Sequence, residues 1–278
     1  LHPYLIFKIG EKLVGQSAAL VAALLTAGYA YFFYYAGTLM TEPFYITAIL
    51  AVIYLTMQMT ASGVDRKKIW LAAGLGVALG IITLLRQLFL LFIPLLMAWI
   101  VFREWKQKRA VLLLEVVLPL FIIGLMILPF TLYNLQRFGQ PVLLNTNAGY
   151  ALFFGNHPIY GTKFIAILPP EIGSYQSLIP TELFPLSEAA LDQALLKLAI
   201  QYILAAPGRY LLLSISRIPV YFQFWPSADS GLISSLSRVG SFGIMLPFML
   251  YGVIRWIVTE GLRNSTSPVW LLLLFGVV

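Results

Sequence analysis

Residues 111–132 read VLLLEVVLPLFIIGLMILPFTL, an apolar run in which Glu115 is the only charged residue. A helix needs about 20 consecutive apolar residues to cross the hydrocarbon core of a bilayer, so this run is long enough to span a membrane. Outward from it along the chain, further apolar runs of similar or shorter length occupy residues 17–36, 44–59, 69–85, 88–102, 210–225, 239–258 and 269–278. The sequence therefore predicts an all-α, multi-pass bundle of transmembrane helices.

The composition fits a membrane protein and not a soluble domain. Hydrophobic residues make up 60% of the 278 residues, charged residues only 10%, and the mean hydropathy is +0.88, whereas an ordinary soluble domain is about 25% charged. The absence of cysteine excludes a disulfide, a cysteine zinc site and a cysteine nucleophile. The net charge of +7 does not indicate nucleic-acid binding, because the basic residues form short clusters between the apolar runs.

These basic clusters give the predicted helices a direction. Connections rich in Lys and Arg usually face the cytoplasm, and here they alternate with connections that have few basic residues. The clusters are Lys8 and Lys12; Arg66, Lys67 and Lys68; Arg103, Lys106, Lys108 and Arg109; and Arg255 and Arg263. Residues 37–43 have no basic residue, and Arg86 stands alone at residues 86–87. We therefore expect residues 37–43, 86–87 and 136–207 to face outward.

Three segments follow from this pattern. Residues 1–135 carry the first spans, residues 136–238 form an extracytoplasmic segment, and residues 239–278 carry the last transmembrane helices. Within the outer segment, Ser187 as N-cap and Pro207-Gly208 as terminator predict an amphipathic helix over residues 188–206. Both ends of the chain lie in apolar stretches, residues 1–9 and 270–278, so we expect a fragment of a longer membrane domain.

The run at residues 210–225 allows two interpretations. If it spans the bilayer, Arg255 and Arg263 fall on the outer side and the charge rule is broken. If it lies flat at the outer interface, the rule holds. Arg209, Arg217 and the aromatic cluster of residues 221–225 suit such an interfacial helix, and we favour this interpretation.

Three charged residues lie close to the predicted spans, where polar groups are costly and often functional. Arg86, at the outer tip of a hairpin, could hold a lipid phosphate bidentately or simply reach the outer headgroups. Glu42, in the outer turn after Tyr35, could act as a general base or could open the next helix behind Thr41 as N-cap. We interpret Glu115 as a residue that reaches toward the cytoplasmic headgroups.

The densest polar cluster lies at residues 145–161, just after the fifth predicted span. It mixes amides, aromatic rings and turn formers, including Asn145, Asn147, Tyr150, Asn156, His157 and Tyr160. Amides hydrogen-bond sugar hydroxyls and aromatic faces pack on sugar rings, but Asn and Gly also form tight turns without any ligand. His157 alone is weak support for a base or a metal ligand. The sequence has no phosphate-binding loop, Gly-x-Ser-x-Gly or His-Glu-x-x-His motif.

Four segments, taken in order, resemble a known family. Residues 9–43 end in YYAGTLMTEP, and residues 74–99 hold a Gly-rich helix, a basic turn and an apolar helix with Pro94. Residues 129–161 end in an Asn-x-Gly…Gly-Asn-x-Pro pattern, and residues 198–225 contain a Pro-Gly-Arg-Tyr step before an aromatic-rich helix. Together they resemble the GT-C superfamily of membrane glycosyltransferases. The nearest likeness is to bacterial relatives of the dolichyl-phosphate-mannose–protein mannosyltransferases, including the aminoarabinose transferases and the RgtA/B/C/D-like group.

The resemblance implies an inverting transferase of the plasma (inner) membrane. Such an enzyme moves a sugar from a polyprenyl-phosphate-linked donor to an extracytoplasmic glycan, lipid or protein. An acidic residue deprotonates the acceptor, and cations stabilise the leaving lipid phosphate. The family's principal acid lies in the first outer loop, which would precede Leu1, and Glu42 matches a second catalytic acid. The substrate-binding candidates are Tyr35, Arg86, Asn145, Asn147, Tyr150, Asn156, His157 and Tyr160.

Two other classes of protein stay open at this point. A transporter or lipid-linked sugar flippase would carry charged or broken helices near mid-membrane, whereas the polar residues here gather at the predicted outer face. A non-catalytic assembly subunit is also compatible, because the expected main acid is not in this sequence. No cofactor follows from the residues, and a divalent cation stays an open alternative. Membrane lipids are expected partners, and nucleic acid is not.

Overall fold

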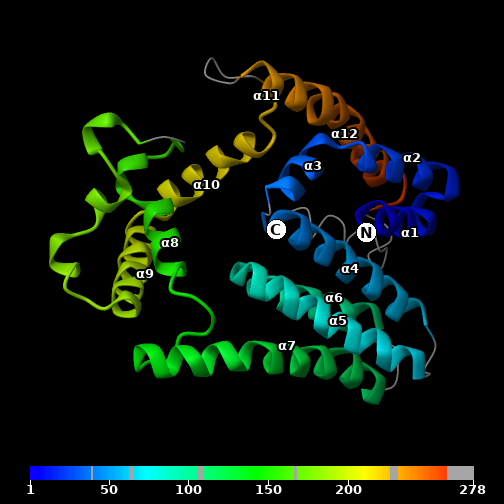
Figure 1. Ribbon diagram of the computed structural model, residues 1–278, viewed down its shortest axis with the longest axis horizontal. Helices are drawn as coiled ribbons and strands as arrows, with labels where there is room; N and C mark the ends of the chain where they lie inside the picture. The colour runs from blue at the N-terminus through cyan, green and yellow to red at the C-terminus, as the bar shows by residue number, and fades with distance from the viewer. Residues whose placement is uncertain (39, 63–65, 105–108, 166–167, 226–230, 262–278) are drawn as a thin grey trace. The chain divides into compact units, whose positions relative to one another are not determined.

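Every regular element in the described part of the chain is a helix, and no strand occurs there. The computed structural model describes the chain except for residues 39, 63–65, 105–108, 166–167, 226–230 and 262–278 (Figure 1), so the apolar run at 269–278 lies outside the described residues. Two units are formed, Leu1–Leu128 with Phe224–Val278, and Pro129–Gln223. The predicted all-α class is confirmed.

The helices of the first unit follow the predicted apolar runs, except that residues 17–36 and 88–102 are each divided between two helices. They are α1 (His2–Val14), α2 (Gln16–Ala27), α3 (Ala30–Gly37), α4 (Glu42–Ala61), α5 (Arg66–Leu85), the 3-10 helix η1 (Gln87–Leu91), α6 (Ile93–Glu104), α7 (Arg109–Phe138, which continues into the second unit), α11 (Leu232–Ser237), the π-helix η6 (Arg238–Gly243), α12 (Ile244–Trp256) and the π-helix η7 (Ile257–Gly261). Four stretches are long and apolar enough to cross a membrane: Glu42–Ala61, Arg66–Leu85, Leu113–Phe138 and Leu232–Thr259. The chain is therefore a multi-pass membrane protein.

Residues 17–36, predicted as one span, form two helices instead. α2 and α3 are bent by 46° relative to each other, and Gly28 caps the end of α2. Glycine is among the weakest helix formers, so the apolar run is interrupted where its helix propensity is lowest. The bent pair is still long and apolar enough to count as one broken span.

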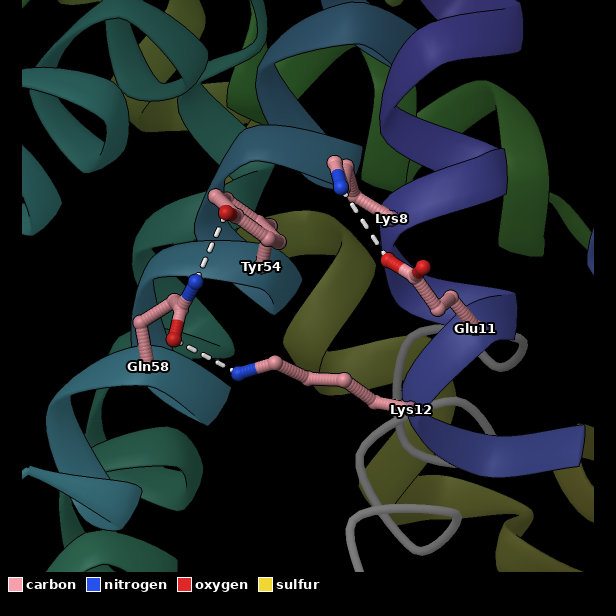
Figure 2. A network of polar contacts seen from close by, with 5 residues as sticks. All are labelled: Lys8, Glu11, Lys12, Tyr54 and Gln58. Carbon is pink, nitrogen blue, oxygen red and sulfur yellow. Dashed lines mark hydrogen bonds and ion pairs between the residues drawn. The ribbon is translucent and has the colours of Figure 1, made fainter. Parts of the chain in front are cut away.

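α1 and α4 run in the same direction. Near their first residues, His2 Nδ1 lies 3.2 Å from Thr47 Oγ1. Near their last residues, Lys12 Nζ donates a hydrogen bond of 2.6 Å to Gln58 Oε1 (Figure 2). α2 turns back after Gly15, whose φ of +87° is readily adopted only by glycine. The start of α1, the end of α3 and the start of α4 therefore lie on one side of the unit, here called the Glu42 side.

α5 and α7 are also parallel to each other. Lys68 pairs with Glu115 near the start of both helices, and Gly80 packs against Met126 near the far end, where a Cβ on the glycine would overlap the sulfur. The apolar stretch Gln87–Arg103, formed by η1 and α6, therefore runs in the opposite direction and connects the end of α5 to the start of α7. α7 accordingly runs toward the Glu42 side, as α5 does.

The interpretation of Glu115 as a residue that reaches the headgroups is wrong. Its side chain is 0% exposed and forms an ion pair with Lys68, which is 1% exposed. Within the described residues, neither carboxylate oxygen of Glu115 has a hydrogen-bond partner of good geometry. A buried charge persists only when an opposite charge compensates it, so Glu115 depends on Lys68. Lys68 in turn faces the carboxylate and is not exposed.

The second unit is built on two helices that pack side by side, α8 (Ala148–Asn156) and α9 (Glu188–Ala205) (Figure 1). The 3-10 turns η2 (Pro158–Tyr160), η3 (Pro170–Ile172), η4 (Tyr175–Leu178) and η5 (Thr181–Leu183) connect them, and α10 (Pro207–Tyr221) follows. Its core contains Phe153, Ile179, Leu191, Leu195 and Ala199. The helix predicted over residues 188–206 is present, and Ser187 is its N-cap residue, although the Ser187 hydroxyl makes no capping hydrogen bond.

The contact between α8 and α9 depends on Gly149. A Cβ at this position would overlap the backbone carbonyl of Asp192 and would lie 2.8 Å from Asp192 Oδ1. We expect Gly149→Ala to force the helices apart and to lower the free energy of unfolding by about 1–3 kcal/mol, the usual range for overpacking, as measured by denaturation of the purified protein. Gly155→Ala is the matched control, since a Cβ there would meet nothing closer than 3.9 Å. Equal stability of the two variants would contradict this account.

Candidate active site

The two charged residues expected in separate outer turns, Glu42 and Arg86, contact each other. Arg86 Nη2 donates a hydrogen bond of 2.6 Å to Glu42 Oε1. Glu42 is the first residue of α4, and Arg86 joins α5 to η1 in an extended conformation, with φ −144° and ψ 99°. The antiparallel packing of α4 and α5 thus places a carboxylate and a guanidinium together at the ends of two spans.

A capping role explains only part of the position of Glu42. An acidic residue in the first turn favours a helix because it faces the positive end of the helix dipole, and Glu42 lies in that turn. Thr41, however, has helical backbone angles, and its hydroxyl makes no capping hydrogen bond. The helix start therefore gives no reason for the pairing of Glu42 with Arg86.

The ion pair is accessible to a ligand. The side chain of Arg86 is 49% exposed and that of Glu42 is 36% exposed, and the Arg86 guanidinium carbon lies 6.0 Å from the centre of the Tyr45 ring. Exposed ion pairs contribute only about 0.2–1 kcal/mol to stability, so the fold does not depend on this one. A guanidinium binds carboxylate and phosphate with the same planar fork, and Arg86 can therefore exchange one for the other.

Tyr35 lies in the same unit, on α3, within a cluster of tyrosine rings. Its ring centre is 6.1 Å from that of Tyr31 and 5.4 Å from that of Tyr34. These three tyrosines line a cleft that also includes Arg238. Tyr35 thus belongs to a second polar feature of the unit, beside the ion pair.

The amide candidates belong to the second unit and differ in exposure. Asn145 and Asn147 have exposed side chains. Asn156 is buried, and its Nδ2 donates a hydrogen bond of 2.9 Å to the carbonyl of Leu152. Asn156 Oδ1 is buried and has no hydrogen-bond partner within the described residues. Asn156 therefore orders the end of α8, whereas Asn145 and Asn147 face solvent.

Both tyrosines of the cluster remain protonated at neutral pH. The backbone N–H of Tyr150 donates a 3.1 Å hydrogen bond to Asp192 Oδ1, and burial, together with the charges of Asp192 and Glu188, raises the pKa of the Tyr150 phenol. Burial and a hydrogen bond with Tyr175 raise the pKa of Tyr160 to about 12. Each phenol can therefore donate a hydrogen bond but cannot serve as a base.

Two arginines of α10 hold the turn that follows α8. Arg209 Nη2 donates a hydrogen bond of 2.8 Å to the carbonyl of Asn156, and its Nη1 donates one of 3.4 Å to the carbonyl of His157. Arg217 donates to the carbonyl of Gly155. The sequence suggested only an interfacial role for these arginines, because no local pattern links them to a turn more than 50 residues earlier.

Two carboxylates of α9, Glu188 and Asp192, were not among the predicted site residues. Asp192 accepts hydrogen bonds from backbone N–H groups in the first turn of α8, including that of Gly149, and burial raises the pKa of its carboxyl group. Glu188 accepts a hydrogen bond of 2.5 Å from Thr146 and lies 3.4 Å from Arg137. Both carboxylates lie near the start of α8, where the helix dipole favours negative charge. Stabilisation of the start of α8 therefore explains the positions of Asp192 and Glu188.

His157 is arranged as a neutral hydrogen-bond donor. Its Nδ1 accepts a hydrogen bond of 3.3 Å from the backbone N–H of Ile159, and its ring packs edge-on against Phe153 and Tyr202. Burial, and then the positive charge of Arg209, lower the pKa of His157. Because Nδ1 is an acceptor, the single proton of the neutral ring is on Nε2.

We expect the stability of the second unit to fall in acid as His157 becomes protonated. The folded-state pKa of His157 is below its ordinary value of 6.5, so the unfolded chain binds the proton more readily. The corresponding part of the free energy of unfolding is fully present above pH 6.5 and is lost as the pH falls toward the folded-state pKa. Imidazole NMR signals of a His2→Gln variant, which leaves His157 as the sole histidine, should show Nε2 protonation at pH 7. A pKa at or above 6.5 would contradict the assignment.

A divalent cation was an open alternative in the sequence. Within the ranges that the structure describes, no group of three or more His, Asp or Glu side chains is arranged so that it could hold a metal ion. The Glu42–Arg86 pair has a single carboxylate, so its chemistry is that of one base and one cation.

Comparison with known proteins gives one match. Residues 1–133, just under half of the chain, match the family model described as dolichyl-phosphate-mannose-protein mannosyltransferase. No curated protein and no solved structure matches. The matched residues include Glu42, Arg86 and Tyr35, but none of the candidates of the second unit. The resemblance to GT-C glycosyltransferases is thereby confirmed for residues 1–133.

This family match indicates a class of activity for residues 1–133. It implies a membrane glycosyltransferase that takes its sugar from a polyprenyl-phosphate-linked donor. The helical spans agree with this class, since such a lipid donor is available only within the bilayer.

Proposed function

We propose that this protein transfers a sugar from a polyprenyl-phosphate donor to a hydroxyl group of an extracytoplasmic acceptor, with inversion at the anomeric carbon. The observation that carries the proposal is the contact of 2.6 Å between Arg86 and Glu42, within the residues that match the family. Sugar transfer from a lipid phosphate needs a base for the acceptor and a cation for the leaving group. The pair supplies one of each.

The reaction begins when the donor phosphate displaces Glu42 from the Arg86 guanidinium, which frees the carboxylate. The acceptor hydroxyl gives its proton to Glu42 while its oxygen bonds to the anomeric carbon from the face opposite the phosphate. The bond between the anomeric carbon and the phosphate oxygen breaks, and the lipid phosphate keeps the electron pair. Arg86 stabilises that charge.

Direct transfer assays test this proposal. Full-length protein in nanodiscs is given a synthetic polyprenyl-phosphate sugar and candidate acceptors, and mass spectrometry follows product and released polyprenyl phosphate. We expect equal amounts of both, and NMR of the product should show the anomeric configuration opposite to that of the donor. A product with retained configuration would refute inversion. Movement of the intact donor across a vesicle membrane, without sugar release, would support a flippase instead.

We place Glu42 and Arg86 outside the cytoplasm. Lys12 and Lys67 lie at the ends of α1 and α5 that are remote from the Glu42 side. Basic residues of this kind mark the cytoplasmic ends of spans. The Glu42 side is then extracytoplasmic, where an acceptor in the cell envelope would be reached.

We also propose that the segment between α7 and α11 remains on this outer side. α7 runs toward the Glu42 side, and α11 lies beside α3, the short helix that leads to this side, because the two helices line the same cleft. Between α7 and α11 the chain must therefore cross the membrane an even number of times, or not at all. If α9 and α10 together formed one span, the number of crossings would be odd. These two helices are also bent by 103° relative to each other.

The properties of α10 support an interfacial position. Its 15 residues extend about 22 Å at 1.5 Å per residue, which is less than the roughly 30 Å of the hydrocarbon core. One face carries Leu213 and Arg217, which are turned into the unit, and the other exposes Leu211, Leu212 and Ile215. A helix of this kind can bury its apolar face at the headgroup boundary.

Cysteine labelling can verify the sidedness, because residues 1–278 contain no cysteine. We expect Gln176→Cys to react with an impermeant maleimide applied to intact cells, and Lys67→Cys to react only after permeabilisation. Both positions have exposed side chains. Reaction of Lys67→Cys in intact cells would show that the orientation is the opposite one, and it would contradict an acceptor outside the cytoplasm.

A further inference from the structure

A second polar feature of the first unit lies between α3 and α11. It is a cleft of about 480 Å³, lined by Tyr31, Tyr34 and Tyr35 of α3 and by Ser234, Ser237 and Arg238 of the facing helix, with Ala30 and Ile233. Ligand sites commonly have volumes of roughly 300–1,000 Å³ and combine apolar walls with a few polar groups. The cleft has this composition, with tyrosine rings on one wall and a guanidinium on the other.

Arg238 supplies the positive charge of the cleft, and no carboxylate of the described residues neutralises it. None of the residues that line the cleft is acidic. In the described part of the chain, the Arg238 side chain makes neither an ion pair nor a hydrogen bond. A half-buried guanidinium without a partner is costly unless a ligand supplies an anion. The neighbouring serine hydroxyls can add hydrogen bonds to the same anion.

The surroundings of the cleft are those of a lipid site. Leu232–Thr259 is a candidate span of 28 residues, which extends about 42 Å and exceeds the roughly 30 Å of the hydrocarbon core. The first turns of this span therefore reach the headgroup layer, and Arg238 is its seventh residue. Beside the cleft, Leu232 and Leu236 expose their side chains, and Ile233 at its edge is exposed as well. A ligand in the cleft would thus have lipid at its mouth.

The backbone at Arg238 is irregular in a way that often accompanies a site. The π-helix η6 begins at Arg238 and ends at Gly243, and short π-helical turns are frequent at functional sites. The Ser241 hydroxyl donates to the carbonyl of Ser237, and the Ser241 and Tyr29 side chains are hydrogen-bonded. These contacts join the wall that carries Arg238 to the helix that carries the tyrosines.

We propose that the cleft between α3 and α11 binds the headgroup of an anionic, phosphate-bearing lipid. Arg238 holds the phosphate, the serine hydroxyls donate to its oxygens, and the tyrosine rings pack on the adjoining sugar or glycerol group. The lipid chain leaves the cleft over the exposed apolar residues of α11. This site does not include Glu42 or Arg86, and it goes beyond the proposed function because it requires no sugar transfer.

Equilibrium binding to the full-length protein in a phosphate-free maltoside detergent tests the site. The probes are a polyprenyl monophosphate, phosphatidylglycerol, the corresponding neutral polyprenol and inorganic phosphate. We expect at least one lipid phosphate to bind at least tenfold more tightly than the polyprenol and inorganic phosphate. Arg238→Ala should weaken this binding at least tenfold. Arg255→Ala, which removes a cation at the other end of the same span, should change it less than twofold.

A second variant separates loss of the site from loss of the fold. Ser234→Trp should fill the cleft, leave Arg238 in place and abolish the same binding. The lipid that loses affinity in both variants identifies the source of the phosphate. Wild-type affinity in folded Arg238→Ala protein, or equal binding of the neutral polyprenol, would overturn the proposal. A protein that shows Arg238-dependent binding but never transfers sugar would refute the proposed function and leave this inference intact.

Discussion

We expect Glu42→Gln to lower the rate of sugar transfer by about 10²- to 10⁴-fold, which is the usual contribution of a positioned general base. Arg86→Ala should lower it by about 10²- to 10³-fold, as the loss of one group that stabilises developing charge does. Both variants should stay folded, because an exposed ion pair contributes at most about 1 kcal/mol. Transfer kinetics and denaturation of the full-length protein measure the two effects separately.

The controls for this prediction come from the same unit. Glu11 forms a similarly exposed ion pair, 3.1 Å from Lys8 Nζ, on α1 (Figure 2), and Glu11→Gln should leave transfer unchanged. The Glu42→Gln, Arg86→Ala double variant should be little slower than the slower single variant, since residues that act in one step are not additive. Normal turnover in both single variants would end the assignment of the site.

We expect the largest effect on stability at the buried pair of Lys68 and Glu115. Removal of one partner from a buried ion pair usually costs about 3–5 kcal/mol, because the other charge is left uncompensated. Glu115→Ala and Lys68→Ala should each lower the free energy of unfolding by this amount. Denaturation in nanodiscs or mixed micelles measures it.

An apolar double replacement distinguishes the charge effect from simple packing. Lys68→Met with Glu115→Leu should be nearly as stable as the natural protein, because well-packed apolar residues often replace a buried pair at no cost. Lys67→Met, at an exposed neighbouring position, should change the free energy of unfolding by less than about 0.5 kcal/mol. A double variant as unstable as either single variant would show that the pair itself stabilises the helices.

The membrane helices could be predicted from the sequence because their signal is local. A run such as residues 111–132 must bury its backbone polar groups within its own helix in lipid, so length and hydropathy alone identify it. The bend between α2 and α3 was missed because Gly28 interrupts the helix without lowering the hydropathy of the run. The helix over Glu188–Ala205 was also predictable, since its N-cap and terminator lie within the segment.

Contacts between distant residues could not be predicted in this way. Glu42 and Arg86 were separate candidates, and only the packing of α4 on α5 shows that they form a pair. The opposite error occurred at Glu115, whose place near the start of an apolar run gave no sign that Lys68 compensates it. The same limit applies to Arg209 and Asp192, whose partners lie 42 to 53 residues away in sequence. Sequence patterns therefore located charged groups but not the charges that they face.

The two arginines of α10 have a mechanical consequence for the loop that carries His157. Arg209 and Arg217 of α10 donate hydrogen bonds to the carbonyls of three successive residues of this loop. If that helix rests at the headgroup boundary, the depth of the His157 turn is set by the lipid surface. A thinner or more loosely packed leaflet would shift the turn together with α10. The amide and aromatic groups of this loop would then respond to bilayer composition without any change in their own sequence.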